Sequence, residues 1–379
     1  ILPLAAAPNG VSIAESAIAA SSHVEEPIRA ELFGIERLEQ HAESLAAAQR
    51  ATDEPSKGRN LLPRVRANAQ VLLDAYRNIA ETVREKSEIT PAAEWILDNF
   101  HVVDEQIRGI RDHLPGSYYR LLPKISAGHL AGYPRVYGLA WAYVAHTDSR
   151  FELETLQRFV RAYQRVQPLT IGELWAVAIH LRVALVENLR RLSQLIVRSR
   201  QARATANELA DRLLGLSGRP AEHPDDVLQR LDDSPLRRPL AVQLVQRLRD
   251  QGPSVLPALA WLDKKLSAQG TSADEMVSQE HRAQAAANVT VRNIITSMRW
   301  MSSRDWPEFF ESVSLVDEAL RAAPAFPTMD FATRDEYRKQ IELLSRGSGR
   351  SEIEVAREAV LLARKAAQER LRSPSPAVE

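Results

Sequence analysis

The chain has 379 residues, which is enough for one large domain or two smaller ones. Its 49 Lys and Arg residues balance 49 Asp and Glu residues, and this zero net charge argues against nucleic-acid binding and against a polybasic membrane anchor. The absence of cysteine excludes disulfides, cysteine-ligated zinc and thiol nucleophiles. No apolar run reaches about 18 residues, so we expect no transmembrane helix in this segment.

The N-terminal part of the chain is mainly helical by its periodicity. Residues 1–24 are small and apolar without clear periodicity, and we expect them to form a mobile tail. Apolar residues at helical spacing then predict helices over 26–49, 61–88 and 91–114. Thr90 caps the third of these helices, and Pro91 occupies its first position, where the missing N–H of proline costs nothing.

Three acidic residues, Asp98, Asp104 and Glu105, lie on this third helix. Pairs of carboxylates on helices serve as acid and base in some glycosidases, so a hydrolase is one hypothesis. Charged residues on a helix are more commonly exposed and solvated, and that is the second interpretation of these three.

The stretch 133–191 combines dense aromatic residues with several polar residues among apolar ones. Helices are predicted over 136–146 and 152–167. Thr170 and Glu173 then form a Thr-x-x-Glu capping box, which opens a further helix to about residue 198.

Glu173, His180 and Glu187 are seven residues apart, so they lie on nearly one line of this helix; we call these three residues the polar line. Because charged residues are mostly exposed, the line could be a solvated face beside a buried apolar stripe. The other interpretation is a wall of a polar groove or a contact with another domain, which the neighbouring Trp175 favours.

If the chain has a functional surface, we expect it over 133–150 and 173–187, because a helical hairpin would bring these two segments together. The candidate residues of this ligand or domain-interface surface are Tyr133, Arg135, Trp141, His146, Asp148, Glu173, Trp175 and His180. Arg can bind a carboxylate, and Trp or Tyr can cover a sugar face or anchor a partner helix.

The alternative is that Trp141 and Trp175 belong to the core while the charged residues only cap and pair. If the surface interpretation holds, the substitutions Arg135→Ala and His180→Ala should leave the melting temperature nearly unchanged. We assign no catalytic residue.

The C-terminal part has more Gly, Pro and Asp between its helices. Helices are predicted over 240–251, 256–268, 272–302, 306–323, 332–345 and 351–372, with a loose end over 373–379. Period-two alternation of β-branched residues is missing. The sequence therefore predicts an all-α fold, an irregular array of about ten to thirteen helices without significant sheet. We expect one helical subdomain over 25–200 and a second over 201–372, packed on the first.

The usual signatures of nucleotide-sugar chemistry are missing. The pairs Asp225-Asp226 and Asp232-Asp233 lie in Pro-rich loops without a flanking strand, unlike the Asp-x-Asp metal motif of many nucleotide-sugar transferases. No Gly-rich phosphate loop, no His-x-x-x-His spacing and no Gly-x-Ser-x-Gly elbow occurs. We expect no metal site and no cofactor in this segment.

Five long pieces, in order along the chain, carry a resemblance to a known family. They are PAAEWILDNFHVVDEQIR from Pro91, LPKISAG from Leu122, the stretch from Tyr133, NVTVRNIITSMRWMSSRDWPEFFESVSLVDEAL from Asn288, and MDFATRDEYRKQIELLSRGSGRSEIEVA from Met329. The chain resembles, over about 87–367 and less clearly over 201–271, the N-terminal region of bacterial cyclic β-1,2-glucan synthases. These are very large membrane-bound glycosyltransferases.

The resemblance implies a non-catalytic accessory or scaffold role, because in that family the glucose-transferring modules lie elsewhere in a far longer chain. It implies UDP-glucose and a divalent metal for the full enzyme, and a location on the cytoplasmic side of the bacterial inner membrane. The expected partners are the other domains of the synthase, with β-1,2-glucan as a further candidate. The contrasting hypothesis is an independent helical glucan-binding protein or a glycoside hydrolase that uses helix-borne carboxylates.

Overall fold

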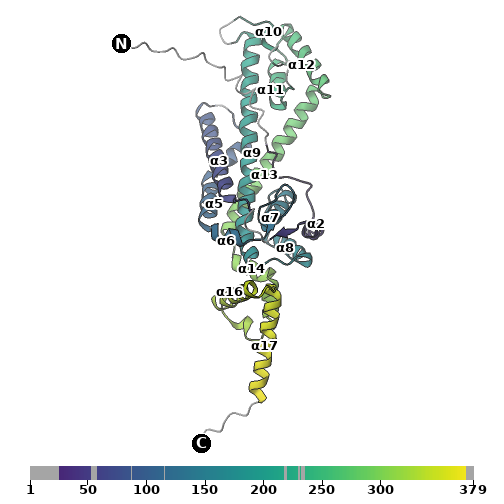
Figure 1. Cartoon of the computed structure of the whole chain (residues 1–379). Helices are drawn as coiled ribbons and strands as arrows, with labels where there is room; N and C mark the ends of the chain where they lie inside the picture. Colours follow the sequence, from purple (N-terminus) through teal and green to yellow (C-terminus); the bar gives the residue numbers. More distant parts are fainter. Residues whose placement is uncertain are drawn as a thin grey trace, which may run out of the picture. The chain divides into compact units, whose positions relative to one another are not determined.

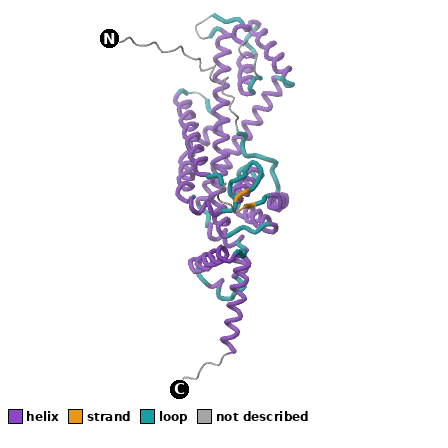
Figure 2. The backbone as a smooth tube through the Cα atoms, in the orientation of Figure 1, coloured by secondary structure: helices purple, strands orange, loops and turns teal. Residues whose placement is uncertain are grey.

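The computed structural model describes residues 25–52, 58–86, 88–114, 116–216, 220–228, 231 and 235–372. Within these residues there are 16 α-helices, 13 of them at least seven residues long, and 76% of the structure is helical. Figure 2 shows a single small sheet among the helices. The predicted all-α fold is therefore confirmed. The predicted tail over 1–24 and the loose end over 373–379 lie outside the described residues.

The chain divides into two compact units whose sequence ranges interleave. The first unit draws on described residues within 1–27, 68–101 and 188–292, and the second on 28–67, 102–187 and 293–379. This division follows spatial contacts, whereas the expected subdomains over 25–200 and 201–372 follow the order of the chain and remain a prediction. Three long helices supply residues to both units: α3 (Leu61–Arg84), α9 (Ile171–Leu214) and α13 (Ala273–Ser302).

The second unit holds the candidate site. Its elements, besides parts of those three helices, are α2 (Ile35–Ala48), β1 (Ala51–Thr52), most of α5 (Phe100–His113), α6 (Gly116–Leu121), β2 (Lys124–Ile125), α7 (Arg135–His146), α8 (Leu153–Val166), α14 (Trp306–Val313), α15 (Leu315–Leu320), the 3₁₀ turn η4 (Phe326–Thr328), α16 (Phe331–Ser348) and α17 (Glu352–Arg372). The two strands pair antiparallel, with Ala51 opposite Ile125.

Two helix pairs organise this unit around the site. Helix α8 packs on α2, because Leu156, Phe159 and Tyr163 recur every three or four residues and are fully buried (Figure 1). Helices α16 and α17 form a hairpin, which turns at Gly349 in the left-handed conformation with φ +70°. The capping box of Ser351 and Glu354 then starts α17, as predicted.

The first unit consists of the remaining parts of the three long helices with α4 (Pro91–Asp98), α10 (Pro224–Leu228), α11 (Arg238–Leu248), the 3₁₀ turn η3 (Pro253–Val255) and α12 (Leu256–Ala268). Helix α12 contacts α10 and α11, and all three lie beside the C-terminal part of α9 (Figure 1). Its apolar core includes Ala206, Ala210, Leu244, Leu248 and Leu262. The burial of Ala206 and Ala210 explains why α9 continues to Leu214, beyond the predicted end near residue 198.

Three predicted helix boundaries differ from the structure for local reasons. The helix predicted over 26–49 begins only at Ile35, because the segment before it pairs with the end of α7: Ala30 N–H donates to the Ala145 carbonyl at 3.0 Å. The helix predicted over 91–114 divides at Asn99, whose side-chain amide donates to the Trp95 carbonyl. The helix over 306–323 divides at Ser314, whose hydroxyl caps α15.

Candidate functional site

The polar line of α9 is buried. Glu173, His180 and Glu187 each have 0% of their surface exposed. The interpretation of a solvated helix face is therefore wrong, and each of the three side chains takes its partners from inside the second unit. Burying charged groups is costly unless they are paired and hydrogen-bonded, so the partners of these residues decide what the line does.

Glu173 is paired with Arg135, the first residue of α7. The Arg135 guanidinium donates from Nε to Glu173 Oε1 at 2.9 Å and from Nη2 to Glu173 Oε2 at 2.5 Å. It also donates to the side chain of Gln167 and to the Pro168 carbonyl. Glu173 accepts from the N–H of Thr170 at 3.0 Å, so the predicted capping box is present. One carboxylate thus caps α9 and fixes α7 against its first turn.

His180 is a neutral histidine in the interior. Its Nδ1 lies 2.7 Å from the Ala176 carbonyl, which requires the proton on Nδ1, while Nε2 is buried and has no hydrogen-bond partner among the described residues. Burial lowers the pKa of His180 to about 4, and the nearby Lys124 adds to this shift. The rings of Tyr119 and Tyr137 lie 6.3 and 6.2 Å from the His180 ring, centroid to centroid. His180 is therefore a packed, uncharged core residue.

Glu187, the last residue of the polar line, makes a second ion pair, in which its carboxylate is fully buried and its partner is partly exposed. Arg64 of α3 donates from Nε to Glu187 Oε2 at 2.9 Å and from Nη2 to Glu187 Oε1 at 2.7 Å. The bidentate geometry makes this a strong and directional contact. The polar line thus joins α9 to α7 at one end and to α3 at the other.

The other five candidate residues lie in separate surroundings. Tyr133 and Trp141 are half-buried and both contact the ring of Tyr137 edge-on. His146 stacks on Phe33 at 4.1 Å. Asp148 forms an ion pair with Arg29 at 3.6 Å, and the ring of Trp175 stacks on that of Phe310 with 4.5 Å between centroids.

The predicted convergence of the two segments holds for Arg135, Glu173 and His180, with Tyr133 and Trp141 beside them through Tyr137. It does not extend to His146, Asp148 and Trp175, which pack against other elements. Because Arg135 and His180 are buried, we no longer expect Arg135→Ala and His180→Ala to leave the melting temperature unchanged. A role for the eight residues in binding a ligand or another domain remains a prediction.

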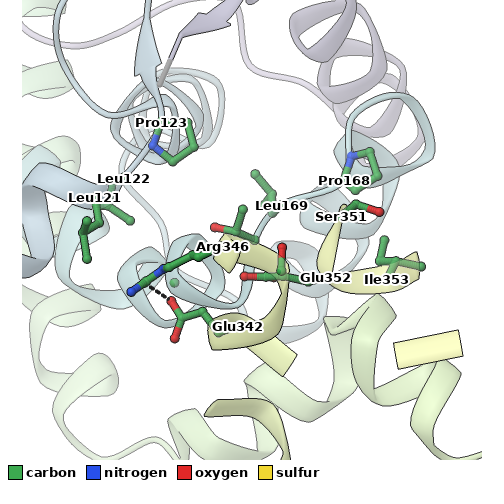
Figure 3. Close-up of a pocket in the computed structure, with 13 residues that line it drawn as sticks. Leu121, Leu122, Pro123, Pro168, Leu169, Glu342, Arg346, Ser351, Glu352 and Ile353 are labelled. Carbon is green, nitrogen blue, oxygen red and sulfur yellow. Dashed lines mark hydrogen bonds and ion pairs between the residues drawn. The ribbon is translucent and has the colours of Figure 1, made fainter. Parts of the chain in front are cut away.

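A cavity that was not predicted from the sequence lies at the N-terminal end of α9. Figure 3 shows this cavity, which has a volume of about 290 Å³. Three stretches of chain line it: 121–123, 168–172 and 342–353. Its charged residues are Glu342, Arg346 and Glu352, and Arg346 pairs with Glu342 at 2.5 Å. The capping boxes that begin at Thr170 and Ser351 marked this region in the sequence, and a capping box predicts a helix start rather than a cavity.

Glu352, the first residue of α17, is the unusual titratable group of this cavity. Its Oε2 accepts from the N–H of Ile171 at 2.7 Å, so the carboxyl group of one helix lies at the N-terminus of another. Burial raises the pKa of Glu352 to about 7, and the charges of Glu342 and Glu173 add to the increase. A carboxyl group that is about half protonated at neutral pH can both donate and accept hydrogen bonds.

A second cavity of about 230 Å³ adjoins the first, and Gly172 and Glu342 line both. Trp175 and Phe331 supply its aromatic wall, and Asp335, Arg338 and Lys339 supply its charges. Arg338 is anchored: it donates from Nε and Nη2 to the two carboxylate oxygens of Asp317 at 2.8 and 2.6 Å. This contact holds α16 on α15 at the second cavity.

These observations define an all-α segment with an internally paired polar core and a two-part cavity at the start of its longest helix. No family model matches the chain. It is 38% identical over 342 residues to the cyclic beta-(1,2)-glucan synthase NdvB of Rhizobium meliloti (strain 1021). The matched region is 88% of this chain but 12% of that relative, so the chain spans about an eighth of the length of the synthase.

The chain is therefore homologous to a segment of a cyclic β-1,2-glucan synthase, and the resemblance predicted from its sequence is confirmed. In the part of the chain that the structure describes, no helix has the length and hydropathy needed to cross a bilayer. The same residues contain no group of three or more His, Asp or Glu side chains placed to hold a metal ion.

Proposed function

We propose that this chain is a helical accessory segment of a cyclic β-1,2-glucan synthase, and that it supports the catalytic modules of the enzyme without transferring glucose itself. The observation that carries the proposal is the 38% identity along 88% of the chain to a segment that is 12% of a synthase. UDP-glucose and a divalent metal are then bound by the rest of the enzyme. Its partners are the other synthase domains, on the cytoplasmic side of the inner membrane.

The buried ion pairs support a structural role for the strongest polar residues. Arg135, Glu173, Arg64 and Glu187 form directional contacts between helices, and the carboxylates of both pairs are fully buried. Groups held in this way are well suited to hold helix positions, and they are shielded from a substrate in solvent. The segment then presents a defined surface to the rest of the synthase.

The three carboxylates on which the contrasting hydrolase hypothesis was based find no such support. Asp98, Asp104 and Glu105 are all exposed, and Asp104 forms an ordinary surface pair with Arg108 at 3.1 Å. A glycosidase acid requires a raised pKa in a partly enclosed site, which an exposed helix face does not provide.

The isolated chain provides a direct test of this proposal. Incubated with UDP-glucose and Mg²⁺ or Mn²⁺, it should release no UDP and form no glucan above the level of a buffer blank, and it should not shorten linear β-1,2-glucan. A synthase that contains the segment serves as the positive control for UDP release. Steady UDP release by the isolated chain, lost in a carboxylate variant, would overturn the accessory role.

A further inference from the structure

The two adjoining cavities at the N-terminal end of α9 share one wall, which is a face of α16. Asp335 and Lys339 of α16 line the second cavity, and Glu342 and Arg346 line the first. Asp335 and Glu342 are seven residues apart, as are Lys339 and Arg346, so all four lie on the same side of the helix. The two cavities adjoin at Gly172 and Glu342 along this side of α16, and together we call them the α16 groove.

The α16 groove contains two acid–base pairs, and at the second cavity Asp335 also lies 3.9 Å from Arg338. Lys339 pairs with Asp335 at 3.2 Å, and Arg346 pairs with Glu342 at 2.5 Å, each pair in the i, i+4 arrangement. Seven residues of α-helix advance about 10 Å, so one acid–base pair follows the other at about that distance. A repeated site of this kind fits a ligand that is itself a repeating chain.

Each acid–base pair selects for a neutral ligand that both donates and accepts hydrogen bonds. A phosphate or carboxylate would face the carboxylate of Glu342 and the partly ionised Glu352 in the first cavity, which disfavours an anion. A cation would compete with Arg346, which already neutralises Glu342. A sugar hydroxyl can donate to the carboxylate and accept from the guanidinium at the same time. The lining therefore suits a polyhydroxyl chain rather than a nucleotide or a basic peptide.

The remaining walls of the groove suit the apolar faces of sugar rings. In the first cavity Leu121, Leu122 and Ile353 line the side walls, and Figure 3 shows the two leucines at one end and Ile353 at the other. In the second cavity Trp175 and Phe331 are half-buried, and their rings meet edge to face at 6.1 Å. Aromatic and aliphatic walls with a few placed polar groups are the usual composition of a small-ligand site.

We propose that the α16 groove binds a short stretch of neutral glucan chain. That this glucan is β-1,2-linked rests on the proposed function, since the chain is homologous to a segment of an enzyme named for that linkage. The accessory segment then holds part of the glucan while the modules elsewhere in the synthase act on it.

Calorimetric titration of the full 379-residue chain with linear β-1,2-gluco-oligosaccharides tests the groove, with β-1,4-linked oligosaccharides of the same length as comparison. The wild-type chain should bind the β-1,2-linked series more tightly. The double substitution Glu342→Gln/Arg346→Gln should weaken binding by roughly tenfold or more, because it removes charge-assisted hydrogen bonds. The single substitution Lys339→Gln, at an exposed side chain, should weaken binding of the longer oligosaccharides and leaves the first cavity intact.

The matched control is the double substitution Asp104→Asn/Arg108→Gln, which removes an exposed i, i+4 pair on α5 outside the groove. It should bind with wild-type affinity. The proposal is overturned if the wild-type chain binds no β-1,2-linked oligosaccharide, if both groove variants bind like the control, or if the two linkages bind equally. None of these results tests the proposed accessory role, because that role is tested by UDP release and not by glucan binding.

Discussion

Replacement of Arg135 by methionine should strongly destabilise the second unit. Arg135→Met keeps much of the volume of a side chain that is 8% exposed, but it removes the guanidinium. This group makes two hydrogen bonds to Glu173, one to Gln167 and one to the Pro168 carbonyl. The carboxylate of Glu173 stays buried and keeps only Thr170 as its donor. Removing one partner of a buried pair typically costs about 3–5 kcal/mol.

The magnitude translates into a large change in melting temperature. For a unit of 150–250 residues, 1 kcal/mol corresponds to about 2–4 °C, so Arg135→Met should lower the melting temperature by about 6–20 °C. The double substitution Arg135→Met/Glu173→Gln should recover most of this loss. It leaves no uncompensated charge, and the amide oxygen of the glutamine can still accept from the Thr170 N–H.

Thermal unfolding and urea unfolding, each followed by circular dichroism at 222 nm, measure the change in melting temperature and in free energy for both variants. The matched control is Arg108→Met, at a residue whose ion pair with Asp104 is exposed, and it should change the free energy of unfolding by less than about 1 kcal/mol. The reasoning fails if Arg135→Met unfolds at the wild-type midpoint. It also fails if the double variant is no more stable than the single variant, since the uncompensated carboxylate of Glu173 would then not be the cause.

Three further predictions follow from single groups. The pKa of Glu352 is raised from 4.5 to about 7, so the stabilisation from its protonated form is present below pH 4.5 and is lost as pH rises through 7. Between pH 5 and pH 8 the wild type should therefore lose up to about 3 kcal/mol of unfolding free energy relative to Glu352→Gln. An equal pH dependence of the two proteins would contradict this. His180, with a pKa lowered to about 4, should show no titration of its ring signals by NMR between pH 8 and pH 5, and a midpoint near 6.5 would show that it is not buried as described. The Gly138→Ala variant should have a lower melting temperature than the Gly109→Ala variant. An added Cβ at Gly138 would lie 2.5 and 2.7 Å from the side chains of Gln49 and Ile125, whereas the nearest atom at Gly109 would lie at 3.9 Å. The reverse order of melting temperatures would exclude crowding at Gly138.

The helix starts could be predicted because their signals are local. The capping box of Thr170 and Glu173 and that of Ser351 and Glu354 are both present in the structure. In each, the interacting residues are three apart, so a short stretch of sequence contains the whole cause. The predicted helix over 26–49 began too early for the opposite reason, because residues near Ala30 pair with the distant end of α7.

The burial of the polar line could not be predicted from its spacing. Seven-residue spacing shows that Glu173, His180 and Glu187 share a side of α9, but not which elements cover that side. The partner of Glu187 is Arg64, 123 residues earlier, and the partner of Glu173 is Arg135, 38 residues earlier. The cavity is beyond sequence analysis for the same reason, since its walls come from three stretches separated by more than 40 and 160 residues. Only tertiary packing brings such residues together.

The most direct test of the accessory role is glucan synthesis by an engineered synthase. In the Rhizobium meliloti relative, the region homologous to this chain is either deleted or replaced by this chain, and membranes are assayed for cyclic β-1,2-glucan made from UDP-glucose. We expect the deletion to abolish synthesis and the replacement to restore it, with loss again when the replacement carries Arg135→Met. Undiminished synthesis by the deleted enzyme would contradict the account, because it would show that the catalytic modules do not need this segment.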